Sequence, residues 1–168
     1  MNNPASKVKI CGLQHLDILE KVCKLPVDFV GFILTKSRRR VELDSLKSMI
    51  SYIRSLGPSA PLATGVFVNP DADELEQIIT EAPLDVIQLH GQESPEFCQF
   101  VKKKFSLPVI KVLSIKGMER KERLLDAVMP YRDCMDILLL DTHDPVYGGG
   151  SGLTFNWEVI PEVKRWAH

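Results

Sequence analysis

A carboxylate stands at the end of an apolar run in the last third of the sequence. The run Ile137–Leu140 precedes Asp141, and the glycine-rich run Gly148–Gly152 follows it. Four apolar residues between polar ones predict a strand that is buried on both faces. A helix is expected to start near Trp157. A strand that ends in a carboxylate and leads through a flexible loop into a helix would supply half of an active site.

Polar or reactive residues also follow the other predicted strands. They are Cys11, the loop Lys36–Arg40, Asn69, His90 and Ser114. A single Cys at a strand end is usually a small buried hydrophobe, and an Asp there commonly caps the next loop. A local hydrogen bond explains a strand-end His as well as ligand binding does. The residue types alone therefore leave structural and functional interpretations open for Cys11, His90 and Asp141.

The segments that position these residues alternate between strand and helix patterns. Apolar runs predict strands at residues 8–10, 29–34, 62–68, 85–89, 107–113 and 137–140. Helical spacing of apolar residues predicts helices at residues 17–24, 71–82 and 119–129 and from Trp157 onward. Two further helices are expected to begin after N-cap residues, one after Asp44 and one after Ser94. Six strand–helix units without a hairpin predict a parallel sheet with helices packed outside it.

Two architectures fit this order, a doubly wound open sheet and a (βα)8 barrel. Ligands gather at one switch point of an open sheet, whereas all carboxyl-terminal strand ends of a barrel face one mouth. Polar residues after nearly every strand therefore favour the barrel. Length argues against a complete one, because 168 residues fall short of the roughly 200 or more that a full barrel needs. We expect an α/β fold, a (βα)8 TIM barrel with only its first six βα units present. Residues 1–168 would form a single domain that lacks units 7 and 8.

Composition and charge exclude several classes of protein. A net charge of −1 gives no electrostatic footprint for nucleic acid, and no apolar run approaches the roughly 18 residues of a membrane span. The first six residues have no hydrophobic core, which argues against a secretory signal. The four cysteines are dispersed without CxxC pairs, which argues against zinc and against a disulfide scaffold. We expect a cytoplasmic protein that binds neither nucleic acid nor membrane.

Six segments, taken in order, resemble the phosphoribosylanthranilate isomerases of the tryptophan pathway. They are Lys9–Gly12, Asp28–Phe32 with Ser37–Arg39 downstream, Gly65–Asn69, Val86–Gly91, Asp141–Thr142, and Gly149–Gly152 with Phe155 and Trp157. Each segment alone is a weak signal, but six in the family's order, each at a strand end, are specific. The family commonly has Thr in place of Ser151 and Asp in place of Asn156. It also continues through a seventh and an eighth strand, whose loops hold the substrate phosphate.

The resemblance implies an Amadori rearrangement of N-(5-phosphoribosyl)anthranilate to 1-(2-carboxyphenylamino)-1-deoxyribulose 5-phosphate. Opening of the ribose ring needs a proton on the ring oxygen, and the resulting Schiff base must lose its C2 proton. One general acid and one general base are therefore required, and neither a metal nor an organic cofactor. By family position Asp141 is the acid, Cys11 is the base and Arg39 binds the anthranilate carboxylate through its planar guanidinium.

The expected roles set conditions on the surroundings of each group. Asp141 must keep a proton near neutral pH, which burial favours, and a thiolate at Cys11 needs positive charge or a helix N-terminus nearby. His90 is expected to line the mouth against the substrate, with a local hydrogen bond as an equal alternative. The remaining predicted substrate contacts come from a mobile loop that closes over the substrate, formed by Gly149, Gly150, Ser151 and Gly152. Cys23, Cys98 and Cys134 are expected to be structural.

Two alternatives to a working isomerase stay open. A truncated barrel with two open sheet edges would hold the acid and the base without turnover. A non-catalytic α/β protein that binds a phosphosugar would instead show a doubly wound strand order. The expected partner is a small phosphorylated substrate, and the protein is expected to be a monomer or a homodimer.

Overall fold

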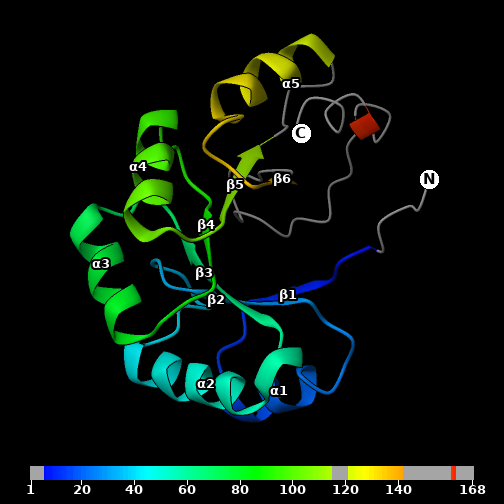
Figure 1. The fold of residues 1–168 in the computed structure, drawn as a ribbon, viewed down its shortest axis with the longest axis vertical. Helices are drawn as coiled ribbons and strands as arrows, with labels where there is room; N and C mark the ends of the chain where they lie inside the picture. Colours follow the sequence, from blue (N-terminus) through cyan, green and yellow to red (C-terminus); the bar gives the residue numbers. More distant parts are fainter. Residues whose placement is uncertain (1–5, 115–120, 142–159, 162–168) are drawn as a thin grey trace. The chain divides into compact units, whose positions relative to one another are not determined.

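A computed structural model of the chain describes residues 6–114, 121–141 and 160–161. All six predicted strands are present: β1 Lys9–Cys11, β2 Phe29–Ile33, β3 Leu62–Phe67, β4 Val86–Leu89, β5 Val109–Ser114 and β6 Ile137–Asp141. They alternate with α1 Leu16–Val22, α2 Leu43–Ser55, α3 Ala72–Glu81, α4 Pro95–Phe105 and α5 Lys121–Val128 (Figure 1). Two short 3-10 helices, η1 Gly57–Ser59 and η2 Met129–Tyr131, complete the described elements. The helix expected from Trp157 lies outside the described residues, apart from residues 160 and 161.

The strands follow one another in the order β1-β2-β3-β4-β5-β6. The pairs β1–β2, β2–β3 and β5–β6 are parallel. A doubly wound sheet would reverse its order at a switch point, so the sequential order excludes that alternative. The predicted α/β class with a parallel sheet is confirmed. The chain forms two compact units, a first unit of residues 1–88 and a second unit of residues 89–168.

Helix α2 shows how the first unit builds its core. Its buried residues Leu46, Met49, Ile50 and Ile53 recur at the spacing that places them on one face. That helix packs against α1 and α3 (Figure 1). The prediction that Asp44 caps α2 is wrong, because the N-cap residue is Glu42. Val41 donates its backbone N–H to Ile33 O at 2.9 Å, so the loop after β2 returns to the end of that strand, and the cap and the helix follow directly.

Helix α4 begins in the second unit as its sequence predicts. The Ser94 hydroxyl accepts the N–H of Phe97 at 3.3 Å, which satisfies one of the free donors of the first helical turn. Further along the unit, Leu124 and Val128 of α5 are buried together with Met135. Half-buried apolar side chains of β5 and β6 pack against this cluster. The second unit therefore has a hydrophobic core of its own.

An aspartate precedes each even-numbered strand and binds the strand before it. Asp28 accepts the N–H of Val8 at 2.7 Å, Asp85 that of Ala63 at 2.8 Å and Asp136 that of Val109 at 2.8 Å. Each aspartate also donates its own backbone N–H to the carbonyl oxygen of that same residue. These three aspartate clamps join the amino ends of successive strands, at the edge opposite to the one where the predicted site residues lie.

Candidate active site

Both predicted catalytic residues end their strands instead of following them. Cys11 is the last residue of β1 and pairs with Gly31 of β2. Asp141 is the last residue of β6 and pairs with Ser114 of β5. Pairing therefore continues one residue further than the apolar runs suggested. A position inside the ladder fixes the backbone of both residues, while their side chains lie at the carboxyl end of the strand.

Gly31 makes room for two side chains of β1. A Cβ atom added to Gly31 would lie 2.7 Å from Cys11 Sγ and 2.8 Å from Lys9 Nζ. Lys9 and Cys11 are two residues apart on one strand, so both side chains project from the same face. The ammonium group and the thiol consequently lie over the same glycine. Cys11 is also exposed, so a ligand can reach its sulfur.

The change Gly31→Ala is expected to crowd both groups. The added methyl would also lie 3.2 Å from the Cys11 Cα atom, which cannot move as a flexible side chain can. Overpacking of this kind typically costs about 1–3 kcal/mol, so we expect a lower free energy of unfolding and a changed rate of Cys11 alkylation by iodoacetamide. Gly57→Ala is the control, because its φ of +77° is strained for Ala but nothing lies within 4 Å. Equal alkylation rates in the two variants would contradict the assigned role of Gly31.

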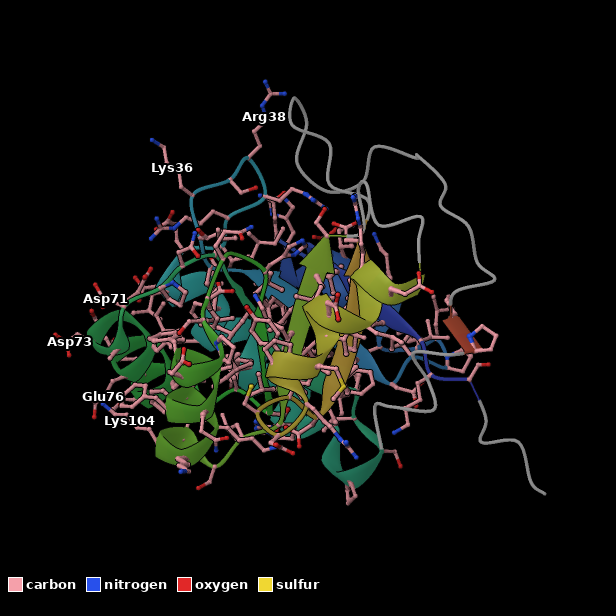
Figure 2. All side chains as sticks on the ribbon, turned by 90° about the horizontal axis from the view of Figure 1, so that it is seen from above. Lys36, Arg38, Asp71, Asp73, Glu76 and Lys104 are labelled. Atoms are coloured by element: carbon pink, nitrogen blue, oxygen red, sulfur yellow. The ribbon has the colours of Figure 1, made fainter. Side chains whose placement is uncertain are left out.

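Arg39 lies beside the residue that follows Cys11. Gly12 has a φ of +87°, and a Cβ atom there would lie 3.0 Å from Arg39 Nη1. Glycine at this position therefore allows the positive φ of the backbone, and it leaves room for the guanidinium of Arg39. Lys36 and Arg38 point outward from the same loop (Figure 2). Of these basic side chains, Arg39 is the one that lies against the end of β1, next to the predicted base.

The amide side chain of Gln14 holds this loop on both sides of Arg39. Gln14 Nε2 donates to the carbonyl oxygen of Arg38 at 3.1 Å and to that of Arg40 at 3.5 Å. Ser37 Oγ accepts the backbone N–H of Arg39 at 3.2 Å. These contacts fix the backbone that carries the guanidinium, so the first unit holds a candidate base site made of Lys9, Cys11 and Arg39.

The second unit brings His90 and Asp141 together. His90 follows β4, and its Nε2 lies 3.2 Å from Asp141 Oδ2. The side chain of His90 is 31% exposed and that of Asp141 is 23% exposed. A partly buried carboxyl group in contact with an imidazole can hold or release a proton, with the direction of the hydrogen bond set by the imidazole tautomer. This pair is the candidate acid site of the second unit.

Residues 8–167 match the family described as N-(5'phosphoribosyl)anthranilate (PRA) isomerase. The chain belongs to this isomerase family. The family resemblance predicted from the sequence is confirmed, and with it the class of enzyme, an isomerase of tryptophan biosynthesis.

Individual relatives agree with the family match. The chain is 42% identical to N-(5'-phosphoribosyl)anthranilate isomerase of Brevibacillus brevis over 95% of its own length and 68% of that protein. A crystal structure of phosphoribosyl anthranilate isomerase from Thermotoga maritima is similar with a TM-score of 0.80 and 30% identity, covering 96% of this chain and 74% of that one. The chain spans about two thirds of the length of the curated relatives that it matches.

A third relative of the isomerase family was solved with a ligand. Its complex contains reduced 1-(o-carboxyphenylamino)-1-deoxyribulose 5-phosphate, and it is similar to this chain with a TM-score of 0.63 and 26% identity. The match covers 81% of this chain and 75% of that one. That ligand is a reduced form of the aminoketose that the family resemblance predicts as the product.

The predicted loop of Gly149, Gly150, Ser151 and Gly152 lies outside the described residues. Within the described ranges, no group of three or more His, Cys, Asp or Glu residues could hold a metal ion. No helix there has the length and hydropathy that crossing a membrane requires.

The other three cysteines have surroundings unlike those of Cys11. Burial raises the pKa of the Cys98 thiol to about 12, and burial also raises the pKa values of Cys134 and Cys23. Cys98 and Cys134 are buried. These thiols are poor nucleophiles and poor bases near neutral pH, as expected for structural cysteines.

Sequence reasoning missed Lys9 and Gln14. The signal for Lys9 was available, because the expected strand places residues 9 and 11 on one face and the thiolate called for a nearby positive charge. Gln14 gave no such signal. Its contacts depend on how the loop after β2 folds back toward the loop after β1, which no short-range pattern encodes.

Proposed function

We propose that this chain isomerises N-(5'-phosphoribosyl)anthranilate to the corresponding aminoketose, with Cys11 as general base and Asp141 as general acid. The observation that carries the proposal is the match to the isomerase family over residues 8–167. In support, both residues stand at the family's motif positions and end their strands. Arg39 lies against Gly12, the residue after Cys11, and His90 contacts Asp141.

The proposed reaction uses the two groups in succession. Asp141 gives its proton to the ribose ring oxygen while the bond from C1 to that oxygen breaks, and the nitrogen lone pair forms the Schiff base. Cys11 then takes the proton from C2, and the electrons of that C–H bond move to give the enolamine. Tautomerisation to the ketone completes the transfer of hydrogen from C2 to C1. The atoms balance without an external oxidant or reductant.

Lys9 supports the role of Cys11. A thiolate, not a thiol, is the effective base, and a neighbouring cation favours the anionic form. Lys9 Nζ lies with Cys11 Sγ over Gly31. Helix α1, by contrast, begins only at Leu16 and has seven residues. We therefore assign the activation of Cys11 to Lys9.

His90 supports the role of Asp141. An acid must hold a proton before the reaction, and a doubly protonated imidazole would favour the carboxylate instead. In the proposed arrangement the imidazole shares one hydrogen bond with Asp141 across 3.2 Å. That contact determines which carboxyl oxygen is left for the substrate. We propose this orienting role for His90 alongside its predicted contact with substrate.

Gln14 provides a test of the role of Arg39 in substrate binding. Gln14→Ala removes both hydrogen bonds to the loop, each worth about 0.5–1.5 kcal/mol. We expect KM to rise about 3- to 10-fold, because the guanidinium is less well placed, while kcat changes less than about twofold. Gln77→Ala is the control, since Gln77 binds Glu81 within helix α3. A fall in kcat at unchanged KM would contradict this role.

The proposal also covers the complete fold, the glycine-rich segment, the substrate, the cellular location and the oligomeric state. The six strands correspond to the first six units of a (βα)8 barrel, and Gly149, Gly150, Ser151 and Gly152 bind the substrate. The substrate is a small phosphorylated molecule, the protein works in the cytoplasm as a monomer or a homodimer, and it needs no cofactor. One solved relative is described as monomers generated from a dimeric isomerase of Thermotoga maritima.

Loss of anthranilate fluorescence on incubation with N-(5'-phosphoribosyl)anthranilate tests the proposed function. The expected result is a loss that is faster than the uncatalysed reaction and proportional to protein concentration. Circular dichroism on the same sample tests whether the chain is folded. A folded chain without turnover would overturn the proposal and favour the inactive-fragment alternative.

A further inference from the structure

An ion pair is buried in the second unit beside Gly91, the residue that follows His90. Lys111 Nζ lies 2.6 Å from Glu93 Oε2, and each side chain is only 1% exposed. Lys111 is on β5, and Glu93 is in the loop between β4 and α4. Neither residue has a role in the proton transfers described above.

Stability alone does not account for such a pair. Removing two charges from water costs several kcal/mol per ion, and apolar replacements of similar volume are often neutral or stabilising. A buried pair is therefore better explained by what its geometry holds in place. Hydrogen bonds to charged groups are also stronger than those between neutral groups, so they position their partners more firmly.

The pair holds both backbone groups of Gly91. The Gly91 N–H lies 3.0 Å from each oxygen of the Glu93 carboxylate, and Lys111 Nζ donates to the Gly91 carbonyl oxygen at 2.9 Å. Tyr131 supports the arrangement from η2. Its hydroxyl donates to Glu93 O at 2.9 Å, and its ring lies 5.4 Å from Lys111 Nζ. Backbone and side-chain contacts together fix the loop that follows β4.

This loop carries His90, which immediately precedes Gly91. Lys111 also belongs to the strand that pairs with β6, where it lies opposite Leu138, three residues before Asp141. The pair thus connects the backbone that carries the imidazole with the strand next to the acid. Displacement of Gly91 would move His90 relative to Asp141, because consecutive residues share a rigid peptide unit.

We propose that Lys111 and Glu93 are positioning residues for the general acid. By fixing Gly91 they hold the His90 imidazole against Asp141. This inference rests on the proposed function of Asp141, but its structural half can be measured independently of activity.

Two double variants separate the charges from the hydrogen-bond acceptor. In Lys111→Met with Glu93→Gln, the carbonyl oxygen of Gln still accepts the Gly91 N–H. In Lys111→Met with Glu93→Leu, no acceptor remains. Both remove the ion pair as a whole, which avoids the cost of one unpaired buried charge. The control is the double variant Lys47→Met with Glu81→Gln, which removes an exposed ion pair of the first unit.

Amide hydrogen exchange and steady-state kinetics of these variants test the proposal. In the Leu double variant, the Gly91 amide should exchange about tenfold faster, and kcat should fall about 10- to 100-fold with KM within about twofold. The Gln double variant keeps an acceptor for the Gly91 N–H but loses the charge and the Lys111 donor, so its Gly91 exchange and its kcat should lie between those of wild type and the Leu double variant. Wild-type kcat in both double variants, or faster exchange without a loss of kcat, would overturn the proposal.

A measurement on the wild-type protein tests the proposal without depending on whether a variant folds. Gly91 lies outside the strands, yet its amide should exchange as slowly as those of β4 and β5, because a buried carboxylate binds it. Exchange at the rate of an open loop would overturn the inference. If the wild-type chain fails to isomerise the substrate, the proposed function fails, while the Gly91 exchange rates still decide whether the pair fixes this loop.

Discussion

Asp141→Asn is expected to lower kcat about 10²- to 10⁴-fold, the usual contribution of a general acid, equivalent to about 2.7–5.4 kcal/mol. Asn has the shape of Asp and can still hydrogen bond to His90, but it carries no acidic proton for the ribose ring oxygen. KM should change less than about threefold, since the carboxyl group acts mainly in the transition state. Loss of anthranilate fluorescence under substrate saturation measures the effect.

The control for Asp141→Asn is an aspartate of the same unit outside the candidate site. Asp133 is exposed, and Asp133→Asn should leave kcat within about twofold of wild type. Circular dichroism and thermal unfolding of both variants show whether either is misfolded. If Asp141→Asn retains more than about a tenth of the wild-type kcat, Asp141 is not the general acid.

Cys11→Ala is the second change with a large expected effect. It removes the proposed base, so kcat should again fall about 10²- to 10⁴-fold. Cys11→Ser should lose nearly as much, because a hydroxyl is far more reluctant than a thiol to become an anion, even beside Lys9. Substantial activity in both variants would remove Cys11 from the mechanism. Cys23→Ser is the matched control, since Cys23 caps the end of α1 away from the carboxyl ends of the strands.

Chemical modification provides an independent readout for the same residue. Iodoacetamide should inactivate the wild-type protein in step with labelling of Cys11, which is exposed. Cys98 should resist, because burial raises the pKa of its thiol to about 12, and Cys134 should resist because it is also buried. Peptide mass mapping identifies the labelled cysteine. Inactivation that follows labelling of another cysteine would contradict the assignment.

Local sequence patterns predicted the elements well because each has a short-range physical cause. The spacing of Leu46, Met49, Ile50 and Ile53 defines the buried face of α2, and Ser94 before Pro95 defines the start of α4. Apolar runs located every strand to within about two residues. Polar residues after nearly every strand favoured a barrel, in which the strands follow one another in sequential order. The observed strand order is sequential.

Features that depend on contacts between distant segments were not predicted. The glycine that admits Lys9 and Cys11 lies 20 residues after Cys11, and its effect appears only once β1 and β2 pair. The buried pair of Glu93 and Lys111 joins residues 18 apart, and charged residues normally predict an exposed surface. The cap at Asp44 was misplaced because the contact of Val41 with Ile33 fixes the backbone directly before Glu42, so the helix begins two residues earlier than its side-chain pattern indicated.

The aspartate clamps have a consequence for how such a chain could arise and vary. Each is preceded by an apolar residue and followed by a strand, as in Val27-Asp28, Leu84-Asp85 and Met135-Asp136, and each joins an odd-numbered strand to the next even-numbered one. The repeating module is therefore a pair of strands with the helix between them, a unit that gene duplication can multiply. Because the clamps lie at the amino ends of the strands, the residues at the carboxyl ends can diverge toward new chemistry while the module keeps its fold.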